Sequence, residues 1–118
     1  MKECEIQEMV EKYCDLKGLR YHRMPDSLYR WIFSTQSKVP VHVKKQCSDY
    51  MKGVPDMIIM APHGAYNQCL LLEIKADKGK LSQGQKNWHK GLNVCVAYGF
   101  ESCKETIDNF INYIDKED

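Results

Sequence analysis

The sequence predicts an α/β domain in which helices flank a central mixed sheet. Near both ends of the chain, apolar residues recur every three or four positions, which is typical of helices that bury one face. Between them lie short apolar runs bounded by proline, glycine and polar residues, which is typical of strands. A chain of 118 residues buries one core, so we expect residues 1–118 to form a single domain.

The first predicted helix spans residues 3–16 and ends at Gly18, because glycine readily adopts the left-handed conformation that closes helices. Its apolar face consists of Ile6, Met9, Val10, Tyr13 and Cys14. Glu3 and Gln7 stand one turn apart and therefore share a face. A glutamate in a first turn ordinarily does no more than interact with the helix dipole, and that interpretation stays open for Glu3.

The segment after this helix is rich in aromatic residues at first and in polar residues later. Residues 19–34 are predicted to hold one or two strands, broken at Pro25, with residues 29–33 as the first strand of the sheet. Further along, Pro40 is predicted to open a short helix that runs through Tyr50, because its fixed φ suits a first helical turn.

Two short apolar runs form the centre of the chain. Residues 57–60 begin directly after Asp56, and residues 69–74 follow a turn, residues 62–67, that contains proline, glycine and asparagine. The two runs are therefore predicted to pair as antiparallel strands.

Three ionisable residues mark this pair of strands. Because side chains alternate along a strand, Glu73 and Lys75 project from one face and Ile74 from the other. Asp56, at the start of the neighbouring strand, adds a second carboxylate. Two carboxylates and an ammonium group can hold a hard cation and a water molecule beside a phosphodiester, so the pattern predicts a metal-dependent phosphodiesterase site. Each motif alone is common, since Pro-Asp forms turns and acidic residues near lysines occur on solvated sheet edges.

The next predicted helix runs from Ser82 to about Leu92. Ser82 and Gln85 form a capping box, in which each side chain bonds the backbone of the other residue. Gln85 therefore has a structural interpretation beside any role in the site. Trp88 and Leu92 are predicted to provide the buried side of this helix.

The C-terminal part is predicted to contain one more strand and one more helix. Residues 94–98 form the strand, and a second capping box, Ser102 with Glu105, opens the helix. The apolar face of that helix consists of Ile107, Phe110, Ile111 and Ile114. The predicted order of elements is helix, three strands, helix, strand and helix.

The net charge of +1 hides an uneven distribution of charged residues. Basic residues bracket the predicted site in the sequence, whereas the tail from Glu101 is mostly acidic. The basic residues are Arg20, Arg23, Arg30, Lys38, Lys44, Lys45 and Lys52 before the site, and Lys75, Lys78, Lys80, Lys86 and Lys90 within and after it. A polyanionic substrate would be attracted to such flanks, although lysines on surface helices are ordinary.

The six cysteines and four histidines show no spacing typical of a zinc site or a disulfide framework. Cys69 and Cys95 lie in apolar runs, where a free cysteine packs as a small apolar residue. We recognise no signal peptide and no apolar stretch as long as a membrane span. We therefore expect a reducing, cytoplasmic location and no membrane contact.

At Pro55-Asp56 and Glu73-Ile74-Lys75 the chain resembles the PD-(D/E)xK nuclease superfamily, and more narrowly the virus-type replication-repair nuclease (VRR-NUC) domain. The resemblance covers nearly the whole chain and rests on the order and spacing of its motifs. Further matches are residues 52–54, Lys80-Leu81-Ser82, Gln85, Trp88 and the opening helix with residues 3–7. The resemblance implies a restriction-endonuclease-like core with the order αβββαβ and a C-terminal helix.

The same resemblance implies a Mg²⁺- or Mn²⁺-dependent endodeoxyribonuclease. Asp56, Glu73 and the Ile74 carbonyl would bind the metal ion, since all-oxygen ligands favour Mg²⁺ or Mn²⁺ over zinc. Lys75 would orient the attacking water or help to deprotonate it, and would offset charge on the phosphate.

The remaining expected site residues support the reaction or the substrate. Glu3 and Gln85 would support the attacking water or a second ion, with Glu8 as the alternative acid of the first helix. Lysines around the site would contact DNA phosphates, namely Lys44, Lys45, Lys52, Lys78 and Lys80.

Small stand-alone domains with this resemblance look like homodimers that cut branched DNA, such as four-way Holliday junctions, in viral or bacterial DNA replication and repair. We therefore expect a homodimer that acts on branched duplex DNA in a bacterial or phage-infected host cell. Two rival hypotheses stay open: a restriction-type or nicking nuclease, and a catalytically silent DNA-binding protein that kept the fold. The intact Asp56, Glu73 and Lys75 argue against the silent protein.

Overall fold

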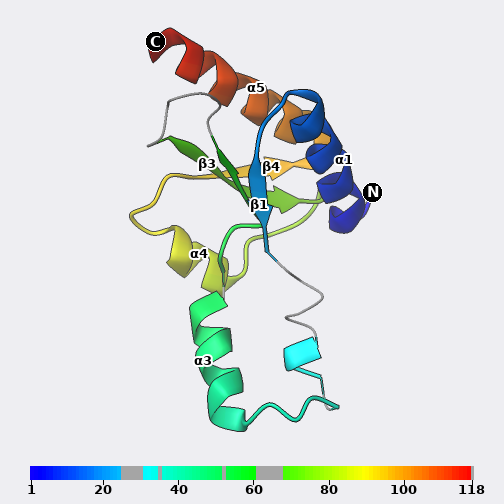
Figure 1. Cartoon of the computed structure of the whole chain (residues 1–118), viewed down its shortest axis with the longest axis vertical. Helices are drawn as coiled ribbons and strands as arrows, with labels where there is room; N and C mark the ends of the chain where they lie inside the picture. The colour runs from blue at the N-terminus through cyan, green and yellow to red at the C-terminus, as the bar shows by residue number, and fades with distance from the viewer. Residues whose placement is uncertain (25–30, 35, 52, 61–67, 118) are drawn as a thin grey trace.

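A four-stranded mixed sheet forms the centre of the described part of the chain in this computed structural model (Figure 1). The structure describes residues 1–24, 31–34, 36–51, 53–60 and 68–117. The strands lie side by side in their sequence order and are β1 (Tyr21–Arg23), β2 (Met57–Met60), β3 (Cys69–Lys75) and β4 (Val94–Tyr98).

The strand pairing makes the sheet mixed. β1 pairs antiparallel with β2, β2 pairs antiparallel with β3, and β3 pairs parallel with β4. The predicted α/β class, the antiparallel pairing of the two central runs and the strand at residues 94–98 are therefore confirmed. The turn predicted over residues 62–67 lies outside the described residues.

Helices α1 (Glu3–Leu16) and α5 (Gly99–Glu117) cover one face of the sheet (Figure 1). Their apolar side chains form one cluster with the strand residues that face them. Its fully buried members include Ile6, Val10, Cys103 and Ile107 from the helices and Met57, Ile59, Leu72 and Ile74 from the strands. Burial of one large aliphatic side chain contributes roughly 1.5–3 kcal/mol, so this face stabilises the fold. Both terminal amphipathic helices predicted from the sequence are confirmed.

Helix α3 (Val41–Met51) projects away from the sheet, and its C-terminal end lies beside α4 (Gln83–His89) (Figure 1). The carbonyl oxygen of Pro40 accepts hydrogen bonds from the amides of Val43 and Lys44 (3.1 and 3.0 Å), so Pro40 precedes the first turn. The helix predicted for this segment is confirmed. Its projection contributes to an elongated outline of 48 × 31 × 26 Å.

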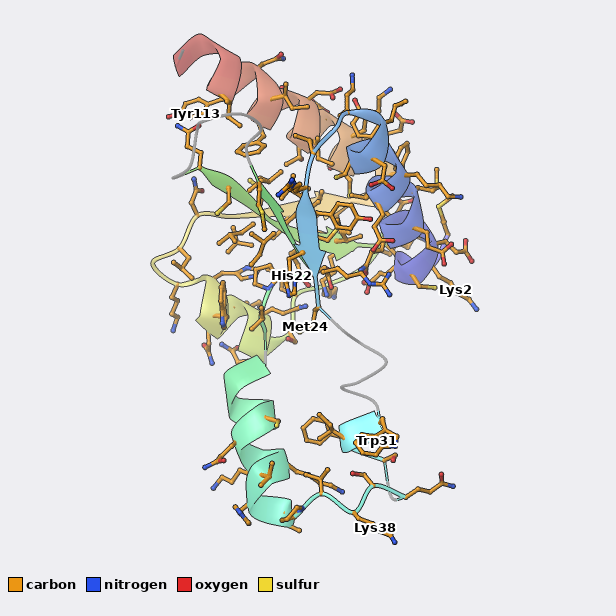
Figure 2. All side chains as sticks on the ribbon, in the orientation of Figure 1. Lys2, His22, Met24, Trp31, Lys38 and Tyr113 are labelled. Carbon is orange, nitrogen blue, oxygen red and sulfur yellow. The ribbon has the colours of Figure 1, made fainter. Side chains whose placement is uncertain are left out.

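Residues 29–33 were predicted to form a strand. Residues 29 and 30 lie outside the described residues, and for residues 31–33 the prediction is wrong. Trp31 and Ile32 are helical, and Trp31 lies far from the sheet (Figure 2). The amide and the hydroxyl of Ser34 both donate to the Trp31 carbonyl oxygen (3.1 and 2.8 Å), which closes a turn. Aromatic residues favour strands only where a sheet neighbour is available, and local hydroxyl bonds compete with sheet pairing. The first strand is β1 instead.

Helix α4 is shorter than predicted. It ends at His89, because Lys90 has an extended backbone (φ −60°, ψ 126°) and its amide donates to the Asn87 carbonyl oxygen (3.3 Å). Leu92 was predicted to be buried, but it lies beyond the helix and is 49% exposed. Trp88 is half-buried, as a residue on the inner side of a short surface helix would be.

Helix α5 begins earlier than predicted, at Gly99 rather than at a capping box on Ser102. The Ser102 carbonyl oxygen accepts a hydrogen bond from Thr106 Oγ1 (2.8 Å), so Ser102 lies inside the helix. β4 ends at Tyr98, and the chain passes from strand to helix without the loop that a capping box requires. Neither α5, with 19 residues, nor any other helix in the described ranges is long and apolar enough to cross a membrane.

Candidate active site

Asp56 and Glu73 lie opposite each other on neighbouring segments of the sheet. β2 and β3 pair Met57 with Leu72, and one step further the same register brings Asp56 beside Glu73. The backbone amide of Ile74 donates a hydrogen bond to Asp56 Oδ2 (2.7 Å), which ties this carboxylate to β3. The fold therefore brings together two acids that the hairpin separates in the sequence.

Glu73 and Lys75 are charged residues inside the molecule, with exposed fractions of 1% and 8%. Lys75 Nζ lies 3.8 Å from Glu73 Oε1, within the range of an ion pair but too far for a direct hydrogen bond. Ile74, between them, packs into the apolar cluster on the other face of β3, as the alternation predicted. Gly79 covers the stem of Lys75, since a Cβ atom on Gly79 would lie 3.3 Å from Lys75 Cβ.

Helix α4 adds Gln85 to the carboxylates of the sheet. Gln85 Nε2 donates a hydrogen bond to Glu73 Oε1. Gln85 Oε1 accepts from the Ser82 amide (2.9 Å), and Ser82 Oγ accepts from the Gln85 amide (3.1 Å). The predicted capping box is therefore confirmed. The same glutamine side chain joins this box to Glu73.

The carboxyl group of Glu73 is unusually hard to ionise. Burial, followed by the negative charge of Asp56, raises the pKa of Glu73 from 4.5 to about 8. The Lys75 ammonium and the Asp56 backbone amide act in the opposite direction without cancelling the rise. Without a further positive charge, the site therefore favours a protonated Glu73 at neutral pH.

Glu3 contributes to the same electrostatic environment. It is exposed at the first residue of α1, and its charge is a further cause of the raised pKa of Glu73. Its role in supporting a water molecule or a second ion stays a prediction, as does the alternative acid Glu8.

The oxygen atoms of this site suit a hard divalent cation. Glu73 Oε2 is buried, and no group in the described ranges forms a hydrogen bond with it, which is costly for a polar atom. A cation beside Asp56 and Glu73 would satisfy this oxygen and offset the repulsion between the carboxylates. No cluster of three or more His, Cys, Asp or Glu residues that could hold a metal occurs in the part of the chain described. Mg²⁺ commonly uses one or two carboxylates and keeps several water ligands, so the residues present fit Mg²⁺ or Mn²⁺.

The lysines predicted to contact DNA fall into two groups. Lys78 and Lys80 are exposed in the segment between β3 and α4, directly after the site. Lys45 is exposed on α3, whereas Lys44 is half-buried and its Nζ donates to a backbone carbonyl oxygen of the preceding loop (3.4 Å). Lys52 lies outside the described residues. One group thus follows the site in the chain and the other lies on the projecting helix.

The structure also brings His89 to the site, which the sequence analysis did not single out. His89 follows Gln85 by one helical turn and so shares its face of α4. Burial, followed by the positive charge of Lys75, lowers the pKa of His89. Its buried Nε2 has no hydrogen-bonding partner among the described residues. The four-residue spacing from Gln85 is the sequence signal that could have identified it.

Two solved structures are similar to this chain over almost its full length. One is described as a "VRR_NUC domain" and matches with a TM-score of 0.57 and 18% identity, over 92% of this chain and 96% of its own. The other, a "VRR_NUC domain protein", matches with a TM-score of 0.60 and 22% identity, over 95% of this chain and 89% of its own. No protein-family model matches the sequence, and no curated protein sequence matches it. The chain therefore has the restriction-endonuclease-like α/β fold of VRR_NUC domains, as the motifs predicted.

Proposed function

We propose that this protein is a metal-dependent nuclease that hydrolyses phosphodiester bonds in DNA. The observation that carries the proposal is the buried Glu73 Oε2, which has no partner in the described part of the chain. It lies in a site with a second carboxylate, Asp56, and an ammonium group, Lys75. The VRR_NUC fold favours a nuclease over other metal-dependent enzymes.

Asp56 and Glu73 would hold Mg²⁺ or Mn²⁺, with the Ile74 carbonyl as a further oxygen ligand. The bound cation would supply a nucleophile near neutral pH and compensate the charge that develops on the phosphate. The Ile74 amide orients Asp56, and Gln85 orients Glu73, so hydrogen bonds hold both carboxylates in place in the protein alone.

Lys75 would act on the attacking water and the phosphate. Its buried ammonium group can orient the water by donating a hydrogen bond and can offset negative charge on the scissile phosphate. Glu3, whose charge reaches Glu73, would support the water or a second ion. Gln85, through its hydrogen bond to Glu73, would support the same water or second ion.

The substrate that we propose is branched duplex DNA, such as a four-way Holliday junction, in viral or bacterial DNA replication and repair in the cytoplasm. Exposed Lys78 and Lys80 follow the site, and Lys44 and Lys45 lie on the projecting α3, so phosphate contacts are available from two elements. Lys52, which lies outside the described residues, stays a proposed phosphate contact from the sequence alone. A homodimer would present two sites and could cut two strands symmetrically.

Two other functions would use the same basic surfaces. A restriction-type or nicking nuclease would also need the carboxylates, whereas a catalytically silent DNA-binding protein would not. A buried carboxylate with an unsatisfied oxygen costs folding free energy, and a silent binder gains nothing that offsets this cost. The site therefore favours an active enzyme.

Cleavage of a labelled four-way junction and of a linear duplex, with and without Mg²⁺, tests the proposal. We expect the junction to be cut faster, and only with Mg²⁺. Asp56→Ala and Glu73→Ala should abolish cleavage and leave junction binding largely intact, whereas Glu105→Ala, an exposed residue of α5, should cut normally. Near wild-type cleavage by either site variant would refute the assignment. Binding of both substrates without cleavage would indicate the silent binder.

A further inference from the structure

A close backbone contact joins Gly53 to the first turn of α4. Gly53 has φ +84°, and a Cβ atom at this position would lie 2.2 Å from the Gly84 carbonyl oxygen and 2.8 Å from the Gln85 amide nitrogen. Both neighbours are backbone atoms, so no side-chain rotation can relieve the clash. Position 53 therefore requires glycine for two separate reasons, its positive φ and its neighbours.

Helix α4 meets the Gly53 segment through its own backbone. The helix has seven residues, and the buried residue among them is Gly84, which has no side chain to pack. Glycine at position 53 lets the two backbones approach more closely than a side chain would allow. A contact between backbones therefore limits how closely α4 can dock against this segment.

The residue after Gly84 is Gln85, which holds Glu73. The Gln85 side chain is fixed at both ends, since its Oε1 accepts from the Ser82 amide and its Nε2 donates to Glu73 Oε1. The capping box orients the side-chain amide relative to α4, and the docking of α4 sets its distance from Glu73. A methyl group inserted at position 53 would displace the first turn and break this bond to Glu73.

We propose that Gly53 is a positioning residue of the site. Its contact with α4 places Gln85 so that Gln85 binds Glu73 Oε1 and leaves Glu73 Oε2 for the cation. This inference rests on the proposed metal-dependent function. Gly53 acts on the site through Gln85. The segment from Gly53 to Asp56 therefore contributes to the site at both of its ends.

Gly53→Ala should weaken Mn²⁺ binding and slow cleavage by roughly 10- to 100-fold, the range found when a residue that orients a metal ligand is lost. Gly91→Ala is the matched control, because Gly91 has φ +75° but no atom within 4 Å of an added Cβ. Both substitutions strain a backbone with positive φ, and only Gly53→Ala adds a clash. Equal losses of Mn²⁺ affinity in the two variants would overturn the proposal.

A double-mutant cycle tests whether Gly53 acts through Gln85. In the Gln85→Ala background, Gly53→Ala should change the Mn²⁺ affinity by less than about twofold, because the bond that it disturbs is already absent. Full additivity of the two losses would overturn the proposal.

Nuclear magnetic resonance of the metal-free protein tests the contact without relying on activity. We expect an Overhauser effect between Gly53 Hα and the Gln85 amide proton in the wild-type protein. The Gln85 side-chain amide signals should shift in Gly53→Ala and not in Gly91→Ala. Absence of the wild-type contact would overturn the proposal, and this measurement decides even if Gly53→Ala does not fold. Failure of the wild-type protein to cut DNA would refute the proposed function and would leave these signals unchanged.

Discussion

The two faces of β3 have opposite effects on stability. Leu70, Leu72 and Ile74 point into the apolar cluster below α1 and α5, where burial stabilises the fold. Glu73 and Lys75 point to the other face, where the ion pair is 3.8 Å long and one carboxylate oxygen has no partner in the described residues. The apolar face thus offsets the cost of the polar face. Such a cost is expected where residues serve chemistry rather than stability.

Substitutions on the two faces should affect the molecule in opposite ways. Glu73→Gln should abolish cleavage and yet make the metal-free protein more stable near pH 8, because a neutral amide replaces a buried group that must otherwise ionise. Leu72→Ala should lower the free energy of unfolding by about 2–5 kcal/mol, while the folded fraction still cuts DNA. Urea unfolding and single-turnover cleavage measure both effects. A Glu73→Gln protein less stable than the wild type would contradict the comparison.

Lys75 tests whether the polar face acts on the reaction rather than only on the cation. Lys75→Met should slow single-turnover cleavage by ~10² to 10⁴, the range for one orienting or acid-base group, while metal affinity survives. Lys75→Arg should not restore full activity, because a guanidinium places its charge differently and keeps its proton. Undiminished cleavage in Lys75→Met would make the lysine a bystander. Loss of metal binding in the same variant would make its role structural.

The pH dependence of stability is the smaller effect that separates the two faces. The pKa of Glu73 rises from 4.5 to about 8, so between these values the native state holds a proton that the unfolded chain has lost. The free energy of unfolding of the metal-free protein should therefore fall as pH rises, by up to about 1.4 kcal/mol per pH unit. His89, whose lowered pKa acts in the opposite sense below 6.5, contributes little above that pH. Urea unfolding at about pH 6.5 and 7.5 measures the slope. An equal slope in Glu73→Gln would assign it to another group.

The elements that the sequence predicts well are those whose signal is local. Consecutive residues show the apolar spacing that predicts α1. They also show the apolar runs, bounded by proline or glycine, that predict β2 and β3. Three features were predicted wrongly because they depend on neighbours distant in the sequence. They are the structure of residues 31–33, the end of α4 and the start of α5. Trp31 has strand propensity but no sheet neighbour among the described residues, so propensity alone misleads.

The candidate site likewise contains residues that the sequence predicts and residues that it does not. Asp56, Glu73 and Lys75 follow from one hairpin, because strand alternation and register bring them together. The sequence marked Gly53 only as part of a family motif, because its neighbours at the site come from another segment. His89 was not singled out, although its four-residue spacing from Gln85 was a local signal. A single sequence therefore identifies the chemical groups of the site better than the residues that position them.

Proton release on metal binding tests the central claim, that Glu73 Oε2 is built to receive a divalent cation. The measurement is calorimetric titration of the metal-free protein with Mn²⁺ at about pH 7 in buffers of different ionisation enthalpy. Because Glu73, with a pKa of about 8, is protonated before the ion binds and ionised afterwards, each bound ion should release about one proton. Glu73→Gln should lose both the binding and the release. Absence of Mn²⁺ binding in the wild-type protein, or equal binding and proton release in Glu73→Gln, would contradict the account.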